Sequence, residues 1–197
     1  MAFAGIGAAE LLAAEPGEPA LTALAHDAVE RIRDACSDAW GWPEDRLRYS
    51  SGSLPEALIA AGHAVSDAAA VDHGVALLEL LLDLEVRDGR LSVTGVGGRG
   101  PHDLEAQFDQ QPIEVGALAD AAARAFEVTG APRWRDAVAL AWAWCLGSND
   151  AGIPMLDPET GAGYDGLERL GRNENRGAES TLAVLAVWQH AVRLRLV

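Results

Sequence analysis

The chain of 197 residues contains no lysine, so all of its 15 basic residues are arginine. Schiff-base catalysis and Walker-type phosphate loops both require a lysine, and both are excluded. Acidic residues outnumber basic residues by 30 to 15, which gives a formal net charge of −15. A negative field of this size repels nucleic acid and anionic membrane surfaces, and it favours a neutral or cationic ligand.

Cysteine is scarce as well. Cys36 and Cys145 both lie in stretches with helical periodicity, no Cys-x-x-Cys motif is present, and two thiols do not make a disulfide framework. Cys145 belongs to the apolar run "ALAWAWCL", which predicts a buried thiol. A reducing compartment is therefore expected, and we predict a cytoplasmic location.

The usual patterns of cofactor, metal and membrane segments are missing. The five histidines are scattered, and no pair has metal-ligand spacing on one helix face, so no metal is expected. The stretch "GVGGRG" has the spacing of a dinucleotide-binding turn, but Pro101 follows it and no helix begins there, so no cofactor is expected. No uncharged apolar run is long enough to cross a bilayer. The first apolar stretch carries Glu10 and has no basic residue before it, which indicates a helix and not a signal peptide.

Apolar residues make up 49% of the chain, enough to build a sizeable core, and the length suits one domain over residues 1–197. Their helical period predicts helices over Phe3–Ala14, Pro19–Ala39, "SLPEALIAAGHAVSD", "AAVDHGVALLELLLDLE", "QPIEVGALADAAARAFEVTG", "PRWRDAVALAWAWCLG" and from Gly177 onward. The third helix is predicted to begin with a capping box, Ser53 to Glu56. The segment "GRLSVTGV" predicts a strand or one arm of a small hairpin, and "DPETGAGYDGLERLG" predicts a hairpin loop.

The helices occur in repeated pairs. The stretch "PEALIAAGHAVSD…GVALLELLLD" aligns with "IEVGALADAAARAFEVTG…AVALAWAWCLG" about 60 residues later, and "GAESTLAVLAVWQHAV" is similar to a third first helix. Repeated helical hairpins predict a solenoid or a closed toroid. Because alanine and glycine dominate the first helices, these are expected to pack closely in an inner row. The long polar loops all precede first helices and are expected to gather on one face, where a site would be built.

Four segments carry a family resemblance: "WPEDRLRYSSGSLPEALIAAG", "EAQFDQQPIEVGALADAA", "WCLGSNDAGIPMLDPETGAGYDGL" and "NENRGAESTLAVLA". Over about Trp40 to Leu194, the chain resembles bacterial α/α-toroid (six-hairpin glycosidase-like) domains, found at the C-terminus of glycosyltransferases or beside saccharide-processing enzymes. The resemblance implies an all-α fold of repeated αα-hairpins with short β-hairpin loops on one face. A complete toroid has about twelve helices. With about seven predicted here, the toroid is either partial or completed by another subunit or domain.

The resemblance has one departure. Family members tend to read Tyr-Asp-Asn where this chain has Tyr49, Ser50 and Ser51, so an acid and an amide are missing from that loop.

The stretch "FDQQPIE" contains the first candidate site residues. Pro112 and Glu114 fit an ordinary helix start, where an acid favours the helix dipole. That explanation leaves Asp109, Gln110 and Gln111 unexplained. Carboxylates and amides in succession can accept from and donate to neighbouring hydroxyl groups, so a role in holding a polyol is predicted beside the structural alternative.

The stretch "NENRGAEST" contains the second group. Asn175 is predicted to cap the last helix, and Gly177 allows a close backbone approach. Glu179 would then point along the inner face, where a carboxylate needs a partner such as Arg172 or Arg176, or a polar cavity. Two readings stay open, a ligand site and a buried structural network. The site reading includes two further residues, Asn173 and Glu174.

Aromatic residues supply further candidates. Tyr164 and Asp165 offer a ring and a carboxylate, with a simple turn as the alternative. The stretch "WGWPEDRLRY" offers a sugar-stacking platform, with core packing as the alternative. The candidates in that stretch are Trp42, Glu44, Asp45 and Tyr49. Four other tryptophans lie within helical patterns and are predicted to be core: Trp134, Trp142, Trp144 and Trp188.

The leading functional hypothesis is a carbohydrate-related protein that binds, and in its enzymatic version processes, a saccharide or nucleotide-sugar-derived glycan in a polar cleft on the loop face. Glycoside processing would need two carboxyl groups flanking the glycosidic bond. The candidates for that pair are Asp109, Glu114, Asp165, Glu174 and Glu179.

Two alternatives are kept. The first is a non-catalytic accessory or docking module of a glycosyltransferase system, which acts as a homo-oligomer or with a glycosyltransferase partner. The second is a sugar epimerase or isomerase, which the missing histidine pair makes weaker.

Overall fold

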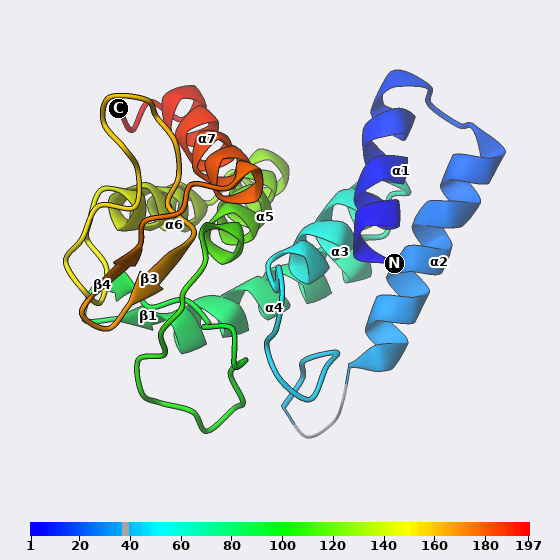
Figure 1. Cartoon of the computed structure of the whole chain (residues 1–197). Coiled ribbons are helices and arrows are strands. Elements are labelled where there is room, and N and C mark those ends of the chain that lie inside the picture. Colours follow the sequence, from blue (N-terminus) through cyan, green and yellow to red (C-terminus); the bar gives the residue numbers. More distant parts are fainter. Residues whose placement is uncertain (37–39) are drawn as a thin grey trace.

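The computed structural model describes residues 1–36 and 40–197, and within them the protein is all-α, as predicted (Figure 1). Its seven helices are α1 (Ala2–Ala14), α2 (Pro19–Ala35), α3 (Ser53–Ala64), α4 (Ala68–Glu85), α5 (Pro112–Thr129), α6 (Pro132–Cys145) and α7 (Ala178–Arg193). Two small antiparallel hairpins are described, β1 (Val86–Arg87) with β2 (Arg90–Leu91), and β3 (Gly166–Glu168) with β4 (Gly171–Asn173). Part of the stretch predicted to end the second helix, residues 37–39, lies outside the described residues.

The helices form two rows. The first helices of the pairs contact one another in succession, α1 with α3, α3 with α5, and α5 with α7. Each of the first three is also packed against the second helix of its pair, α2, α4 or α6. Figure 1 shows α1 and α7 standing at the two ends of this first row. The predicted side-by-side packing of first helices is therefore present.

Glycine and alanine allow the first-row helices to approach closely. A Cβ atom added to Gly52 would lie 2.6 Å from the amide nitrogen of Leu118 and closer still to the carbonyl group of Ala117 on α5. One added to Gly116 would lie 3.2 Å from the Cβ of Ala183 on α7. A Cβ atom does not fit at Gly52, and at Gly116 it fits only if α7 shifts by a few tenths of an ångström, so the row depends on the small residues at these positions.

Three loops that precede first-row helices are joined to one another by isolated β-bridges. Leu47 pairs with Arg99, and Gln110 pairs with both Gly95 and Leu167. These bridges connect the segments that lead into α3, α5 and α7, so the three loops meet on one side of the molecule. The loop after Gly95 continues to Gln111 without a helix.

The start of α3 differs from the sequence prediction. The predicted Ser53–Glu56 capping box is wrong, since Gly52 is the N-cap of α3 and no side chain caps this helix. The backbone at Gly52 lies against α5. Because any side chain at this position would overlap α5, glycine occupies the N-cap position. By contrast, Asp67 caps α4 by accepting a hydrogen bond of 3.0 Å from the amide of Ala70.

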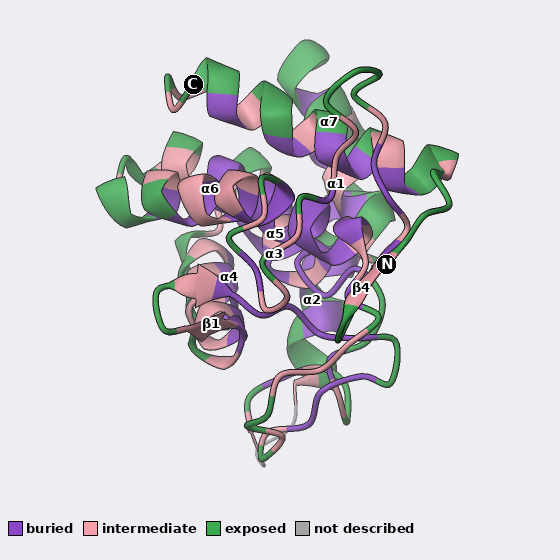
Figure 2. Cartoon of the chain, turned by 60° about the vertical axis from the view of Figure 1, so that its left-hand side comes forward, coloured by how far each residue is buried: buried purple, intermediate pink, exposed green. Residues whose placement is uncertain are grey.

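The core contains Trp134 and Trp144 as predicted, and Cys145 is buried. The prediction for Trp188 is wrong, because 45% of this residue is exposed on α7. Figure 2 shows α7 with both buried and exposed surface along its length. No helix in the described part of the chain is long and apolar enough to span a membrane.

We expect Gly52→Ala to destabilise the protein by about 2 kcal/mol or more, because the new methyl group overlaps the backbone of α5. The φ angle at Gly52 is −60°, so alanine is conformationally acceptable there and the effect is purely steric. Gly7→Ala is the matched control, because no atom lies within 4 Å of its added Cβ and alanine favours a helix by about 1 kcal/mol. Urea denaturation measures both, and equal effects would contradict the close-packing argument.

Candidate functional site

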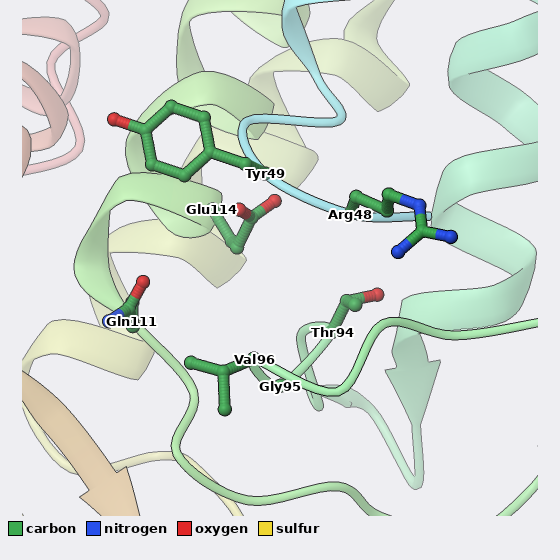
Figure 3. Close-up of a pocket in the computed structure, with 7 residues that line it drawn as sticks. All are labelled: Arg48, Tyr49, Thr94, Gly95, Val96, Gln111 and Glu114. Carbon is green, nitrogen blue, oxygen red and sulfur yellow. The ribbon is translucent and has the colours of Figure 1, made fainter. Parts of the chain in front are cut away.

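A cavity of about 250 Å³ lies where two of the loops meet the start of α5. Figure 3 shows the ring of Tyr49 above the carboxyl group of Glu114, with Gln111 and Val96 below them. The cavity is lined by Arg48, Tyr49, Thr94, Gly95, Val96, Gln111 and Glu114. Three of the predicted site residues, Tyr49, Gln111 and Glu114, are thus brought together here.

Glu114 lies in the first turn of α5 and is almost completely buried. Its two carboxyl oxygens accept hydrogen bonds from the backbone amides of Ser50 at 2.6 Å and Ser51 at 3.1 Å. Ser50 has a φ angle of 54°, in the left-handed region, so the carboxyl group holds a strained loop in place. Burial and the neighbouring charge of Glu85 raise the pKa of Glu114 to about 8, against the opposing effect of the two amide hydrogen bonds.

Glu85 is a further buried acid, and the sequence reasoning missed it. It ends α4 and accepts hydrogen bonds from both the amide and the hydroxyl group of Thr94, each at 2.7 Å. Burial raises its pKa, while Thr94 and the nearby guanidinium of Arg99 lower it. Its position at the end of the Leu-rich helix "ALLELLLDLE" gives no sign of this role in the sequence, because a polar residue at a helix end is ordinary.

Tyr49 connects the loop before α3 to the start of α7. Its hydroxyl group donates a hydrogen bond of 2.6 Å to Glu179, a predicted site residue in the first turn of α7. This bond, together with burial, raises the pKa of Tyr49 to about 12. Glu179 therefore has Tyr49 as its partner, in place of the predicted Arg172 or Arg176.

A second cavity, of about 520 Å³, is lined in part by Ser50, the residue that follows Tyr49. Its walls come from all four first-row helices: Phe3 of α1, Ser53 and Glu56 of α3, Ile113, Gly116, Ala117 and Asp120 of α5, and Glu179, Leu182, Ala183 and Ala186 of α7, with Ser50 from the loop. Glu56 and Glu179 both line this cavity, and both acids lie in the first turns of their helices.

The predicted capping of α7 by Asn175 is wrong. Gly177 is the N-cap, and Asp165 accepts a hydrogen bond of 2.7 Å from its amide. The amide group of Asn175 donates to the other oxygen of Asp165. Burial acts to raise the pKa of Asp165, but hydrogen bonds from Ser180, Gly177 and Asn175 outweigh it and hold the pKa below its usual range. Asp165 therefore stabilises the start of α7 by accepting from the Gly177 amide, although Asp165 itself does not belong to that helix.

Tyr164 lies in a separate cluster with two arginines. It is buried, and the guanidinium carbon of Arg172 lies 3.5 Å from the centre of its ring. Arg172 also pairs with Glu174 at 3.0 Å, and Arg176 pairs with Asp157. Because an arginine covers the ring, this cluster stabilises the β3–β4 side of the loop rather than offering a free stacking face.

The remaining candidates lie apart from the two cavities. Trp42 is completely buried, so its ring is core and cannot stack on a ligand. Gln110 is also completely buried and binds Trp144, Gln107 and Asp150 through its amide. Asp45 forms an exposed ion pair with Arg48 at 3.2 Å.

Three more candidates complete the set. Asp109 is exposed and has a φ angle of 56°, and its carboxyl group lies against the backbone of Gly166. Asn173 accepts a hydrogen bond of 3.0 Å from the amide of Asn175. Glu44 is exposed, and its carbonyl group accepts from the indole of Trp40. Asp109, Asn173 and Glu44 do not line either cavity.

The chain was also compared with known proteins. No protein-family model matches it, and no curated protein matches it. Within the described residues, no group of three or more potential metal ligands is found. The functional inference therefore rests on the fold and on the two cavities.

We expect the unfolding free energy to fall as the pH rises from about 4.5 to 8, because Glu56 and Glu114 keep their protons in the folded state over that range. Burial, and the charge of Asp120 next, raise the pKa of Glu56 to about 8. Glu56→Gln removes its share, so its gain in stability over wild type should grow to on the order of 2 kcal/mol at pH 9 and vanish near pH 4.

Urea denaturation at a series of pH values checks this prediction. Asp83→Asn, an exposed change on α4 that alters the net charge equally, serves as the control. A Glu56→Gln effect that stays constant with pH would show that this carboxyl group titrates normally.

Proposed function

We propose that the protein binds a saccharide on its loop face, between Tyr49, Glu114 and Glu179 and along the first-row helices. The observation that carries this proposal is that three successive first-row helices each carry a first-turn acid that lines a cavity, Glu56, Glu114 and Glu179. Carboxyl groups beside a tyrosine hydroxyl can accept from and donate to hydroxyl groups of a sugar. The larger cavity, of about 520 Å³, has the size of a small-molecule site.

The fold supports the same proposal. Four first-row helices lie side by side and three of them are backed by a second helix, an arrangement that fits part of an α/α toroid. The resemblance of "FDQQPIE" and "NENRGAEST" to six-hairpin glycosidase-like domains points in the same direction, because these stretches supply Glu114 and Glu179. The toroid proposed here is partial, with α1 and α7 at its open ends.

If the protein processes a glycoside, the surroundings of two carboxyl groups indicate which would be the proton donor and which the base or nucleophile. Glu114, buried and protonated near neutral pH, would be the proton donor to a leaving-group oxygen. Glu179, exposed and hydrogen-bonded to Tyr49, would be the base or nucleophile. Binding alone needs neither role, so binding is measured first.

We expect neutral oligosaccharides of one class to raise the melting temperature, since a ligand that binds only the folded state stabilises it by mass action. Tyr49→Phe and Glu179→Gln should each weaken binding about tenfold, because each removes one hydrogen-bonding group from the site. Thermal-shift screening followed by calorimetry measures the affinities. Glu168→Gln, an exposed change on β3, is the control, and a loss of binding there as large as at Glu179 would place the site elsewhere.

A second candidate function is a non-catalytic module that docks on a glycosyltransferase partner or on a second copy of the chain. The observation that favours it is a stripe of exposed apolar residues along α7. The stripe consists of Leu182, Leu185, Trp188 and Val192, which are 41% to 64% exposed. A face of this kind is typical of protein contacts.

If the stripe joins two copies, sedimentation should show concentration-dependent association of the wild type, and Trp188→Asp should reduce it at least tenfold with little effect on stability. Leu170→Asp, which changes an exposed residue in the β3–β4 turn, is the control. A wild type that stays monomeric at all concentrations would exclude self-association. Docking on a glycosyltransferase would then be tested by measuring binding to that protein.

A further inference from the structure

Helix α1 has no polar face. Its 13 residues include one charged residue, Glu10, and the rest are alanine, glycine, leucine, isoleucine and phenylalanine. One face is buried, because a Cβ atom added to Gly5 would lie 2.8 Å from the Cβ of Ala28 on α2 and 3.8 Å from that of Ala57 on α3. A helix that is apolar all round is ordinarily buried all round, and α1 is too short to cross a bilayer. The part of α1 that this chain leaves uncovered is therefore expected to contact another protein surface.

The uncovered part, called the α1 face below, consists of Ala4, Gly7, Leu11 and Ala14. These residues recur at spacings of three and four, so they lie on one side of the helix. All of them are exposed, Leu11 to 54%, and no atom lies within 4 Å of a Cβ atom added to Gly7. The α1 face is thus uncharged and made mostly of small side chains.

The other end of the first row carries a face of larger side chains, the α7 stripe. It is uncharged as well and consists of Leu182, Leu185, Trp188 and Val192. Two faces of this kind pack together without removing a charge from water, and they give a cationic partner nothing to pair with. Small residues on one face leave room for the large side chains of the other, so the α7 stripe fits the α1 face better than it fits a second α7 stripe.

The charges beside the two faces have opposite signs. Residues 1–36 carry six acids and two arginines, whereas residues 178–197 carry one acid and two arginines. Glu15, at the end of α1, and Arg195, just after α7, are both exposed, and neither forms an ion pair within the described part of the chain. The net charge of −15 repels two copies in most orientations, and a contact between these two ends is the orientation in which the local charges attract.

We propose that a second copy of the chain covers both faces, with the α7 stripe of each copy packed on the α1 face of the other. A two-fold axis makes both contacts at once, so the pair is closed and leaves neither face free. The row has the curvature that such closure needs, since Phe3 of α1 and Leu182 of α7 line the same cavity. This inference rests on the self-association version of the second candidate function and adds the surface that the α7 stripe meets.

The experiment places opposite charges on the two faces. Leu11→Arg alters the α1 face and Leu185→Glu alters the α7 stripe, and both positions are exposed. We expect sedimentation equilibrium to show a wild-type dimer and at least tenfold weaker association of each variant alone, because each contact would then enclose an unpaired charge. Mixing the two variants in equal amounts should restore association. The mixed pair has one unaltered contact and one in which the two new charges attract each other.

Matched controls test whether the positions matter and not the charges. Leu170→Arg and Leu170→Glu, at a position in the β3–β4 turn that is 95% exposed, should leave the dimer intact. Ala4→Arg is a second variant of the α1 face and should act as Leu11→Arg does. Circular dichroism of each variant shows whether a lost dimer reflects a lost fold.

The other outcomes separate this inference from the proposals that precede it. A dimer that survives both Leu11→Arg and Ala4→Arg would overturn the contact with the α1 face and leave self-association through the α7 stripe standing. A mixture that stays monomeric would overturn the pairing of the two faces, and growth beyond two copies would overturn the closed pair. A wild type that is monomeric at all concentrations would overturn self-association altogether. Saccharide binding is measured separately and is unaffected by any of these results.

Discussion

The close approach of the first-row helices is the constraint on which the rest of the structure depends. Gly52 lies against the backbone of α5, and Gly116 lies against Ala183 of α7, so the starts of three helices are held almost in contact. Close-packed backbones cannot adjust to larger side chains without moving a whole helix. Each first-turn acid is consequently fixed by the same packing that builds the core, and the site inherits its geometry from the row.

Polar contacts fix the loops, and these contacts are strong because the packing of the first-row helices keeps water away from them. Glu114 reaches from α5 to the amides of Ser50 and Ser51, and it does so in a place that water hardly enters. The effective dielectric constant there is low, so these hydrogen bonds are stronger than at the surface, and the carboxyl group is also harder to ionise. One residue thus both orders the loop that carries Tyr49 and keeps a proton near neutral pH.

Periodicity and composition predicted the helices well, because apolar spacing reports directly which side of a helix is buried. The repeat and the placement of long loops also predicted that the loops would share one face. Individual roles were harder to predict. Asn175 and Trp42 have residue types typical of a cap and a stacking platform, but a cap depends on backbone direction at one residue and a platform depends on exposure. Neither is encoded in local spacing.

Glu85 and Glu56 show most clearly what the local sequence does not predict. Both occur in ordinary helical patterns, and only the packing of α4 and α3 against other elements makes Glu85 fully buried and Glu56 partly buried. Asp109 and Glu174 had the richer local sequence and turned out to lie outside the cavities. Local polarity therefore indicated the face where the loops meet, but it did not show which acids on that face line a cavity.

The acids of the first-row helices also affect the stability of the protein. Burying a carboxyl group without a partner lowers the free energy of unfolding, and Gln at position 56 would avoid the cost with almost the same shape. Glu114 recovers part of its cost through two amide hydrogen bonds, and Asp120 through His190, whereas Glu56 recovers nothing within the described chain.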